Sequence, residues 1–249
     1  MILKKLAGAV RRQDWFTVLL EVLIVVLGVF IGIQVANWNE AQSDRKRELV
    51  LLGTLVEDVR EDIADIEVTI AVETSRISAL DHLVRQVSGA SLPKGFASAR
   101  GRIDIVPYPA YSEDQDFDIG YTLFIMNSVP SRRAAYETII ITGGLGLIQD
   151  TTLVREIQEY YARADSISEF EDVMQLTRQR FVEAQRQAGI SPVDEHAIED
   201  LIDLFSRDVA MTAAAKEYWL FTNYHLRLLT EHGASTKRLG NILERAIRS

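Results

Sequence analysis

Three aspartates near the middle of the chain have the spacing with which a calcium-binding loop begins. Asp114, Asp116 and Asp118 alternate as the first three ligands of such a loop do. The rest of the sequence departs from that pattern, because the sixth position is Ile119 instead of glycine and the twelfth is Ile125 instead of glutamate. We therefore expect no calcium site here.

The histidines and the glycine motif do not predict a catalytic or metal site either. His225 and His232 are seven residues apart, roughly 10 Å along a helix, whereas zinc ligands on one helix need a spacing of three or four residues. We interpret both as core or boundary residues. Gly143-Gly144-x-Gly146 has no lysine in P-loop register, so it predicts a helix stop. With no cysteine and no hydrolase motif, we expect no enzyme, no metal and no cofactor.

Acidic residues gather along the chain after residue 56. On a helix, Glu57, Asp58, Glu61, Asp62 and Asp65 would form a negatively charged ribbon. Such a ribbon could bind divalent cations, but it is more often a solvated helix face. We interpret it as solvated.

Residues 16–36 are the most apolar stretch of the chain. They contain one formal charge, Glu21, and as a helix they would span roughly 30 Å, the thickness of a hydrocarbon core. Trp15 and Trp38 bracket the stretch as interfacial anchors in a lipid bilayer would. A cleaved signal peptide is the competing interpretation, but its apolar region would be shorter and followed by an A-x-A site. We predict an uncleaved transmembrane helix over residues 15–38.

One face of the predicted span carries small residues and its single acid. Glu21, Val25, Gly28, Gly32 and Ala36 fall within about 80° of each other at 100° per residue. The Gly28-x-x-x-Gly32 motif lets two helix backbones approach closely in lipid, although glycine is frequent in membrane helices in any case. The Glu21 carboxyl would face a protein partner, water or a headgroup, or would be protonated or snorkel to the interface. We expect this face to contact a second copy or another membrane protein.

Charge indicates which side of the membrane each part occupies. Residues 1–14 carry four basic residues and one acid, against Arg45, Lys46 and Arg47 beyond the span. Positive residues tend to stay in the cytoplasm, so we expect a cytoplasmic tail over residues 1–14 and a periplasmic domain over residues 39–249 of a bacterial inner-membrane protein. The net charge is −9; the tail contributes +3 and the span −1, which leaves −11 for the domain. That charge argues against nucleic acid as a partner.

The sequence around the end of the span is similar to a known family. Asn37-Trp38-Asn39-Glu40 follows the glycine face and leads into the helical stretch EAQSDRKRELVLLGTLVEDVREDI. This arrangement resembles a family of uncharacterised bacterial single-pass membrane proteins, in which a span ending in an N-W-N-E signature precedes a helical domain of unknown function. Residues 135–161 also resemble that family. The resemblance implies an anchor and a mainly helical fold, and it implies no activity.

Beyond the span the pattern predicts one long helix. No proline occurs before Pro93, and apolar residues keep a seven-residue repeat over residues 49–87. The first seam positions are Leu49, Val56, Ile63, Ile70, Ile77 and Val84, and the second are Leu52, Val59, Ile66, Glu73, Leu80 and Val87. Because Glu73 would face its twin in a parallel dimer, we expect the chain's own later helices to bury this seam and residues 43–249 to fold as a monomer. Ile63→Asp would then unfold the domain.

The rest of the chain predicts further helices around an irregular insertion. Residues 89–130 are rich in proline, so we expect a loop-rich insertion with short strands over residues 102–106 and 121–126. Later helices are expected over residues 131–142 capped by Ser131, over 151–188, over 191–205 with a Ser191-Pro192 start signal, and over 209–247. The predicted fold class is mostly α: a transmembrane helix continuing into a long helix, packed in an elongated helical bundle.

Three classes of function remain open. We expect first a membrane-anchored interaction or scaffold protein, which binds itself or another membrane protein through its span and helical domain. The alternative is a periplasmic, sensor-like ligand-binding domain with Tyr108, Tyr111 and Tyr121 near its pocket, and the third is an enzyme. An exposed apolar stripe would favour the first, an apolar pocket at the insertion the second, and a deep polar pocket with converging carboxylates or histidines the third.

Overall fold

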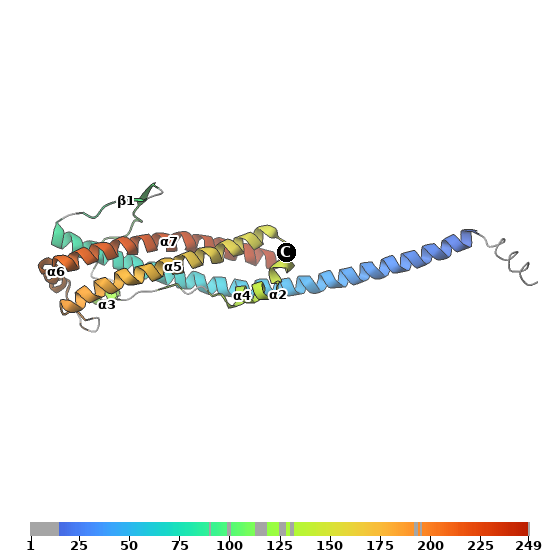
Figure 1. Cartoon of the computed structure of the whole chain (residues 1–249), viewed down its shortest axis with the longest axis horizontal. Coiled ribbons are helices and arrows are strands. Elements are labelled where there is room, and N and C mark those ends of the chain that lie inside the picture. The colour runs from blue at the N-terminus through green and yellow to red at the C-terminus, as the bar shows by residue number, and fades with distance from the viewer. Residues whose placement is uncertain are drawn as a thin grey trace, which may run out of the picture. The chain divides into compact units, whose positions relative to one another are not determined.

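The computed structural model describes residues 15–89, 91–98, 101–112, 119–124, 128–129, 132–191, 194 and 196–248. Within these residues the chain is mostly α-helical, as predicted, with a small two-stranded sheet (Figure 1). The long helices are α2 (Trp15–Ser88), α5 (Thr151–Gln187) and α7 (Val209–Arg248). The three aspartates of the partial calcium pattern, Asp114, Asp116 and Asp118, lie outside the described residues.

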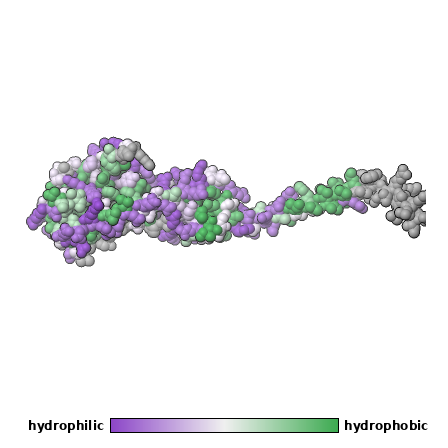
Figure 2. Space-filling view, in the orientation of Figure 1, coloured by the Kyte–Doolittle hydropathy of each residue, from purple (hydrophilic) through white to green (hydrophobic). Residues whose placement is uncertain are grey.

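The chain divides into two compact units, Met1–Leu51 and Leu52–Ser249. In the first unit, the described side chains of α2 over residues 19–38 are exposed, and this segment is long and apolar enough to cross a membrane. Figure 2 shows the hydrophobic surface that they form. Trp38 is exposed, whereas the side chain of Trp15 lies outside the described part of the chain.

Helix α2 remains helical over its whole length because its sequence contains no proline. It ends at Ser88, where Gly89 adopts a φ of +62° and donates its N–H to the Arg85 carbonyl at 2.9 Å. Glycine suits this left-handed stop because it has no Cβ. Helix α2 thus contains both the predicted span and the predicted long helix.

In the second unit, α2 buries one stripe of side chains within the single chain. Most of the second seam positions are buried, as predicted: Leu52, Val59, Ile66, Glu73 and Leu80. Three of the first positions in this unit are only half-buried: Val56, Ile63 and Ile70. The stripe instead includes the residues that follow each second position by three: Leu55, Asp62, Thr69, Arg76 and Leu83. The buried face is therefore rotated away from the predicted seam, and the rotation brings charged residues into the interior.

Helices α5 and α7 lie side by side, as Figure 1 shows. The ring of Phe181 lies 5.2 Å from that of Tyr218, and the ring of Tyr160 lies 5.1 Å from that of His232, so the two helices run antiparallel. Helix α2 comes close to α7 at Gly233, where a Cβ would lie only 3.1 Å from Cγ2 of Ile66. The missing side chain of Gly233 is what permits this approach.

The sequence predicts the bounds of the long helices better than those of the short ones. Helices α5 and α7 agree with the predicted bounds to within one residue, and the Asp150 side chain caps α5 by accepting from two backbone N–H groups. Helix α6 (Ile198–Arg207) begins seven residues after Ser191, so the predicted start is wrong. The Ser191 carbonyl lies 3.1 Å from Nε2 of His196, within an irregular connection, and Pro192 lies outside the described residues.

Helix α4 (Ala134–Ile141) is shorter than predicted at both ends. Its N-cap is Arg133, which makes no side-chain capping bond; Ser131, the predicted cap, lies outside the described residues. Gly143 has a φ of +71° and is followed by the 3-10 turn η1 (Gly144–Leu147). The helix stop predicted from the glycine motif is thus confirmed.

The insertion contains a β-hairpin and a short helix. Strands β1 (Gly95–Ser98) and β2 (Gly101–Asp104) pair antiparallel, which confirms the first part of the strand predicted over residues 102–106. The strand predicted over residues 121–126 is wrong, because α3 (Ile119–Phe124) occupies its described part. A short, mainly apolar stretch does not distinguish strand from helix. Two backbone carbonyls of α3 accept hydrogen bonds from arginine side chains. Arg76 donates to the carbonyl of Thr122, and Arg178 donates to the carbonyl of Phe124.

Candidate functional site

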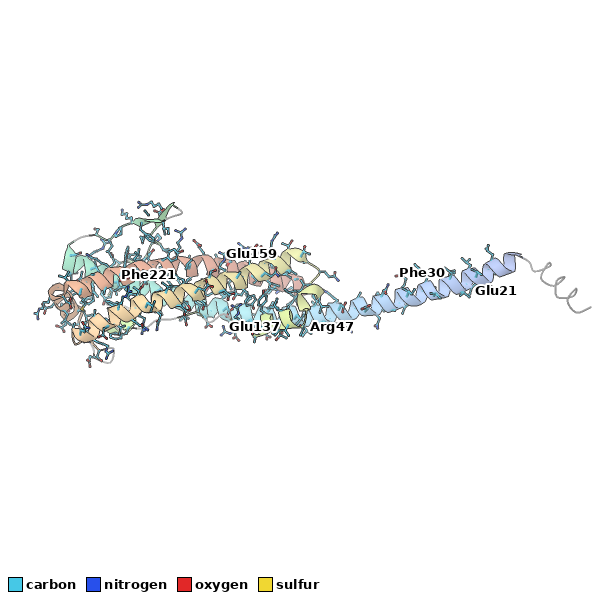
Figure 3. The ribbon with its side chains drawn as sticks, in the orientation of Figure 1. Glu21, Phe30, Arg47, Glu137, Glu159 and Phe221 are labelled. Carbon is cyan, nitrogen blue, oxygen red and sulfur yellow. The ribbon has the colours of Figure 1, made fainter. Side chains whose placement is uncertain are left out.

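The residues predicted to make a helix contact in the membrane occupy exposed positions of α2. Glu21, Gly28, Gly32 and Ala36 are all exposed, and a Cβ at Gly28 or Gly32 would meet no described atom within 4 Å. Figure 3 labels Glu21 together with Phe30, which lies on the opposite side of the helix at 100° per residue. Within the described chain this face is therefore uncovered. A contact there, and the anchoring role of Trp15 and Trp38, stay predictions.

A group of four charged side chains lies in the interior between α2, α5 and α7. Glu73 and Arg76 come from α2, Glu171 from α5 and His225 from α7, and all four are buried. Arg76 Nη1 donates to Glu73 Oε1 at 2.5 Å, and its Nε donates to the Thr122 carbonyl at 3.0 Å. His225 lies between the two glutamates, with Nε2 3.0 Å from Glu171 Oε1 and Nδ1 3.4 Å from Glu73 Oε1. We call these four residues the ionic network.

The charges of the ionic network balance one another. Burial alone would lower the pKa of His225, but its interactions with Glu171 and Glu73 outweigh burial and raise the pKa to about 9. His225 is therefore a cation at neutral pH. Burial alone would raise the pKa of Glu73, but Arg76 and His225 hold it below its ordinary value. Two cations thus face two carboxylates, which offsets the large cost of burying each charge.

A second polar cluster surrounds Asp62 of α2. The interpretation of Asp62 as part of a solvated ribbon is wrong, because only 1% of this residue is exposed. The hydroxyl of Tyr160 donates to Asp62 Oδ2, and Arg132 Nη1 donates to Asp62 Oδ1 at 2.9 Å. Arg132 also pairs with Asp65 at 2.8 Å and with Glu61 at 2.6 Å. Part of the acidic ribbon therefore binds an arginine of the same chain.

Two of the surface grooves on the second unit are lined by residues of interest. One, of about 640 Å³, is lined mainly by polar side chains that include Asp165, Glu171 and Arg178. Glu171 belongs both to this groove and to the ionic network, whereas His225 does not line the groove and is fully buried. Among the residues that the structure describes, no three acidic or histidine side chains form a group that could hold a metal ion.

The other groove, of about 690 Å³, lies between α2 and the insertion. Tyr108 and Tyr111 line it, so two of the three tyrosines predicted to lie near a pocket do so. The side chain of Tyr121 lies outside the described part of the chain. We call this the insertion groove.

Comparison with known proteins gives one match. Residues 21–93 match a protein-family model described as a family of unknown function, DUF6090. The match begins at Glu21 and ends five residues beyond the end of α2. This stretch of the chain is therefore similar to the DUF6090 family. No match is found among curated proteins or among solved structures.

The DUF6090 match confirms the predicted resemblance for the first of its two sequence patches. It covers Glu21, Gly28, Gly32 and Ala36, as well as Glu73 and Arg76 of the ionic network. It covers less than a third of the chain, and the second patch, residues 135–161, lies outside it. The matched stretch thus contributes Glu73 and Arg76 to the ionic network, and Glu171 and His225 lie beyond it.

The sequence did not predict the partners of these buried charges. It identified Glu73 as a seam residue and His225 as a core residue, but it assigned no partner to either. A signal for the buried face does exist in the sequence. The positions that follow each second seam position by three residues begin and end with leucine, at Leu55 and Leu83, and are polar between them, at Asp62, Thr69 and Arg76. A seven-residue repeat with apolar residues at both ends is consistent with a buried stripe of the helix that also carries paired polar residues. No comparable pattern marks Glu171.

We expect the free energy of unfolding to be greatest near pH 6.5. The pKa of His225 is raised to about 9 in the folded chain, so its contribution is complete below pH 6.5 and is lost as pH rises through 9. Burial, aided by Arg163, lowers the pKa of His232 to about 4, so stability is lost as pH falls from 6.5 towards 4. Each displacement of the pKa corresponds to at most about 3.4 kcal/mol of stability.

Denaturant unfolding of the full chain in detergent between pH 4 and pH 10 would measure both slopes. We expect His225→Gln to flatten the alkaline slope and His232→Gln to flatten the acidic one. An alkaline slope unchanged by His225→Gln would show that this histidine is not a buried cation.

Proposed function

We propose that this chain is a single-pass protein of the bacterial inner membrane that acts as an interaction protein, by packing the Glu21/Gly28/Gly32/Ala36 face of its span against another membrane helix. A second copy of the chain is the simplest partner. In this proposal residues 39–249 lie in the periplasm, and the stronger positive charge of residues 1–14 supports that orientation.

The observation that carries the proposal is the open surface over the two glycines. Gly28 and Gly32 leave 4 Å of free space where a Cβ would project, among side chains that are all exposed. In lipid, apolar side chains can remain exposed without cost, but close backbone packing at small residues is favourable. The carboxyl of Glu21 on the same face adds a polar group that gains from a partner.

The experiment compares the association of the full chain in membranes with that of two double variants. Gly28→Ile with Gly32→Ile adds bulk on the proposed contact, and we expect association to weaken by about tenfold or more, equivalent to about 1.4 kcal/mol. Leu23→Phe with Leu27→Phe adds bulk at the same four-residue spacing on the other side of the helix and should leave association unchanged. Cross-linking in isolated membranes, followed by gel analysis, measures the complexed fraction.

Equal behaviour of the two double variants would contradict the proposal. Both variants keep the span apolar, so insertion should survive in each. Membrane fractionation checks that insertion, so a loss of complex is not confused with a loss of protein.

A further inference from the structure

The insertion groove has two walls from different parts of the second unit. One wall is the last part of α2, with Asp81, His82 and Arg85. The other includes residues 105–111, a segment without regular secondary structure that we call the strap. A volume of about 690 Å³ is typical of sites that enclose a small organic molecule.

The strap is held in place by side chains of the helices beneath it. The Asn223 amide brackets Val106, since its Oδ1 accepts from the Val106 N–H at 3.2 Å and its Nδ2 donates to the Val106 carbonyl at 3.4 Å. The Ser78 hydroxyl donates to the Pro109 carbonyl at 2.8 Å. Asn223 and Ser78 are both buried. A wall fixed in this way loses little further freedom when a ligand binds.

Aromatic and aliphatic side chains supply much of the surface of the groove. The ring of Tyr111 lies 5.0 Å from that of His82. Tyr108 accepts a hydrogen bond from Trp219 Nε1 at 3.2 Å, which fixes its position. Ile105 adds aliphatic surface beside these rings. The groove is therefore suited to an aromatic or branched apolar group.

The charged residues of the lining leave a positive charge in excess. Asp81 is the acidic residue of the lining. Both of its carboxylate oxygens accept a hydrogen bond from Nε of Arg85, at 2.8 and 2.7 Å. Lys94 lines the same groove, is exposed, and has no ion pair among the described residues. A net positive groove is a local exception in a domain whose formal charge is −11.

We propose that the insertion groove binds a small organic carboxylate with an aromatic or branched apolar body. The carboxylate lies at Lys94 and Arg85, and the body lies against Tyr108 and Tyr111. This binding site goes beyond association through the span and does not depend on it.

The test uses the full chain in lipid nanodiscs and three probes with the same ring but different charge. Phenylacetate is the anion, phenylacetamide the neutral analogue and phenethylamine the cation. Saturation-transfer NMR, with empty nanodiscs as the blank for partition into lipid, measures binding. We expect phenylacetate to bind at least about tenfold more tightly than the other two, the usual order of effect for a charge-assisted contact.

A matched pair of variants locates the site. Lys94→Glu reverses the free charge in the groove and should weaken phenylacetate binding by about tenfold or more. Lys216→Glu makes the same change on an exposed lysine of α7 outside the groove lining and should have no effect. Equal binding of the three probes, preference for the amine, absence of binding, or equal effects of the two variants would each overturn the proposal.

Discussion

Replacing Ile66 with aspartate is expected to unfold the helical domain, whereas Val68→Asp leaves it folded. Ile66 is 1% exposed and contacts α7 at Gly233, so its replacement places an unpaired carboxylate in the core. Such burial costs several kcal/mol, a large part of the stability of an ordinary domain. Val68 lies two residues further along α2 and is 59% exposed, so a charge there remains in water.

Circular dichroism and denaturant titration of the detergent-solubilised chain would measure the difference between the two variants. Ile63, the position chosen from the sequence pattern, is a weaker test because the structure leaves it half-buried. A folded Ile66→Asp chain whose only change is the loss of an oligomer would show that the buried stripe of α2 is an interface between copies.

The second large effect is expected at Arg76. Arg76→Met removes one of the two cations from the ionic network and leaves two buried carboxylates with His225 alone. Breaking a buried pair in this way typically costs about 3–5 kcal/mol. The matched control is Arg60→Met on the same helix, where an exposed pair with Glu244 at 3.4 Å is lost. Exposed pairs of this kind contribute at most about 1 kcal/mol.

A double variant separates loss of charge balance from loss of packing. Glu73→Gln removes one buried carboxylate, so Glu73→Gln with Arg76→Met restores equal numbers of charges around His225. We expect the double variant to be more stable than Arg76→Met alone by more than about 1 kcal/mol. Denaturant midpoints measure all four chains. Simple addition of the two single effects would contradict the view that these residues act as one network.

The fold class and the long helices could be predicted from the sequence because local signals determine them. Absence of proline and a repeated apolar pattern are enough to define α2, and Asp150 marks the start of α5. The short elements depend on tertiary contacts instead. Helix α3 is mainly apolar and is stabilised by Arg76 and Arg178, which come from helices distant in sequence. No local pattern contains that information.

The buried charges were the harder part of the site to predict for the same reason. Asp62 belongs to an acidic run and looks solvated, yet Tyr160 and Arg132 hold it in the interior. A single sequence shows the charge but not the partner, and the partner decides whether the charge is buried. The buried face of α2 is rotated about the helix axis relative to the predicted seam, so Asp62 is buried and the neighbouring Ile63 is only half-buried.

The central functional claim is that one face of the span contacts another protein. Photo-cross-linking in intact membranes tests it most directly, with benzoylphenylalanine placed in the full chain at Val25 or at Leu23. At 100° per residue these positions point about 160° apart, and Val25 lies on the glycine face. We expect a protein adduct from Val25 and none from Leu23. Adducts of equal yield from both positions, or from Leu23 alone, would contradict it.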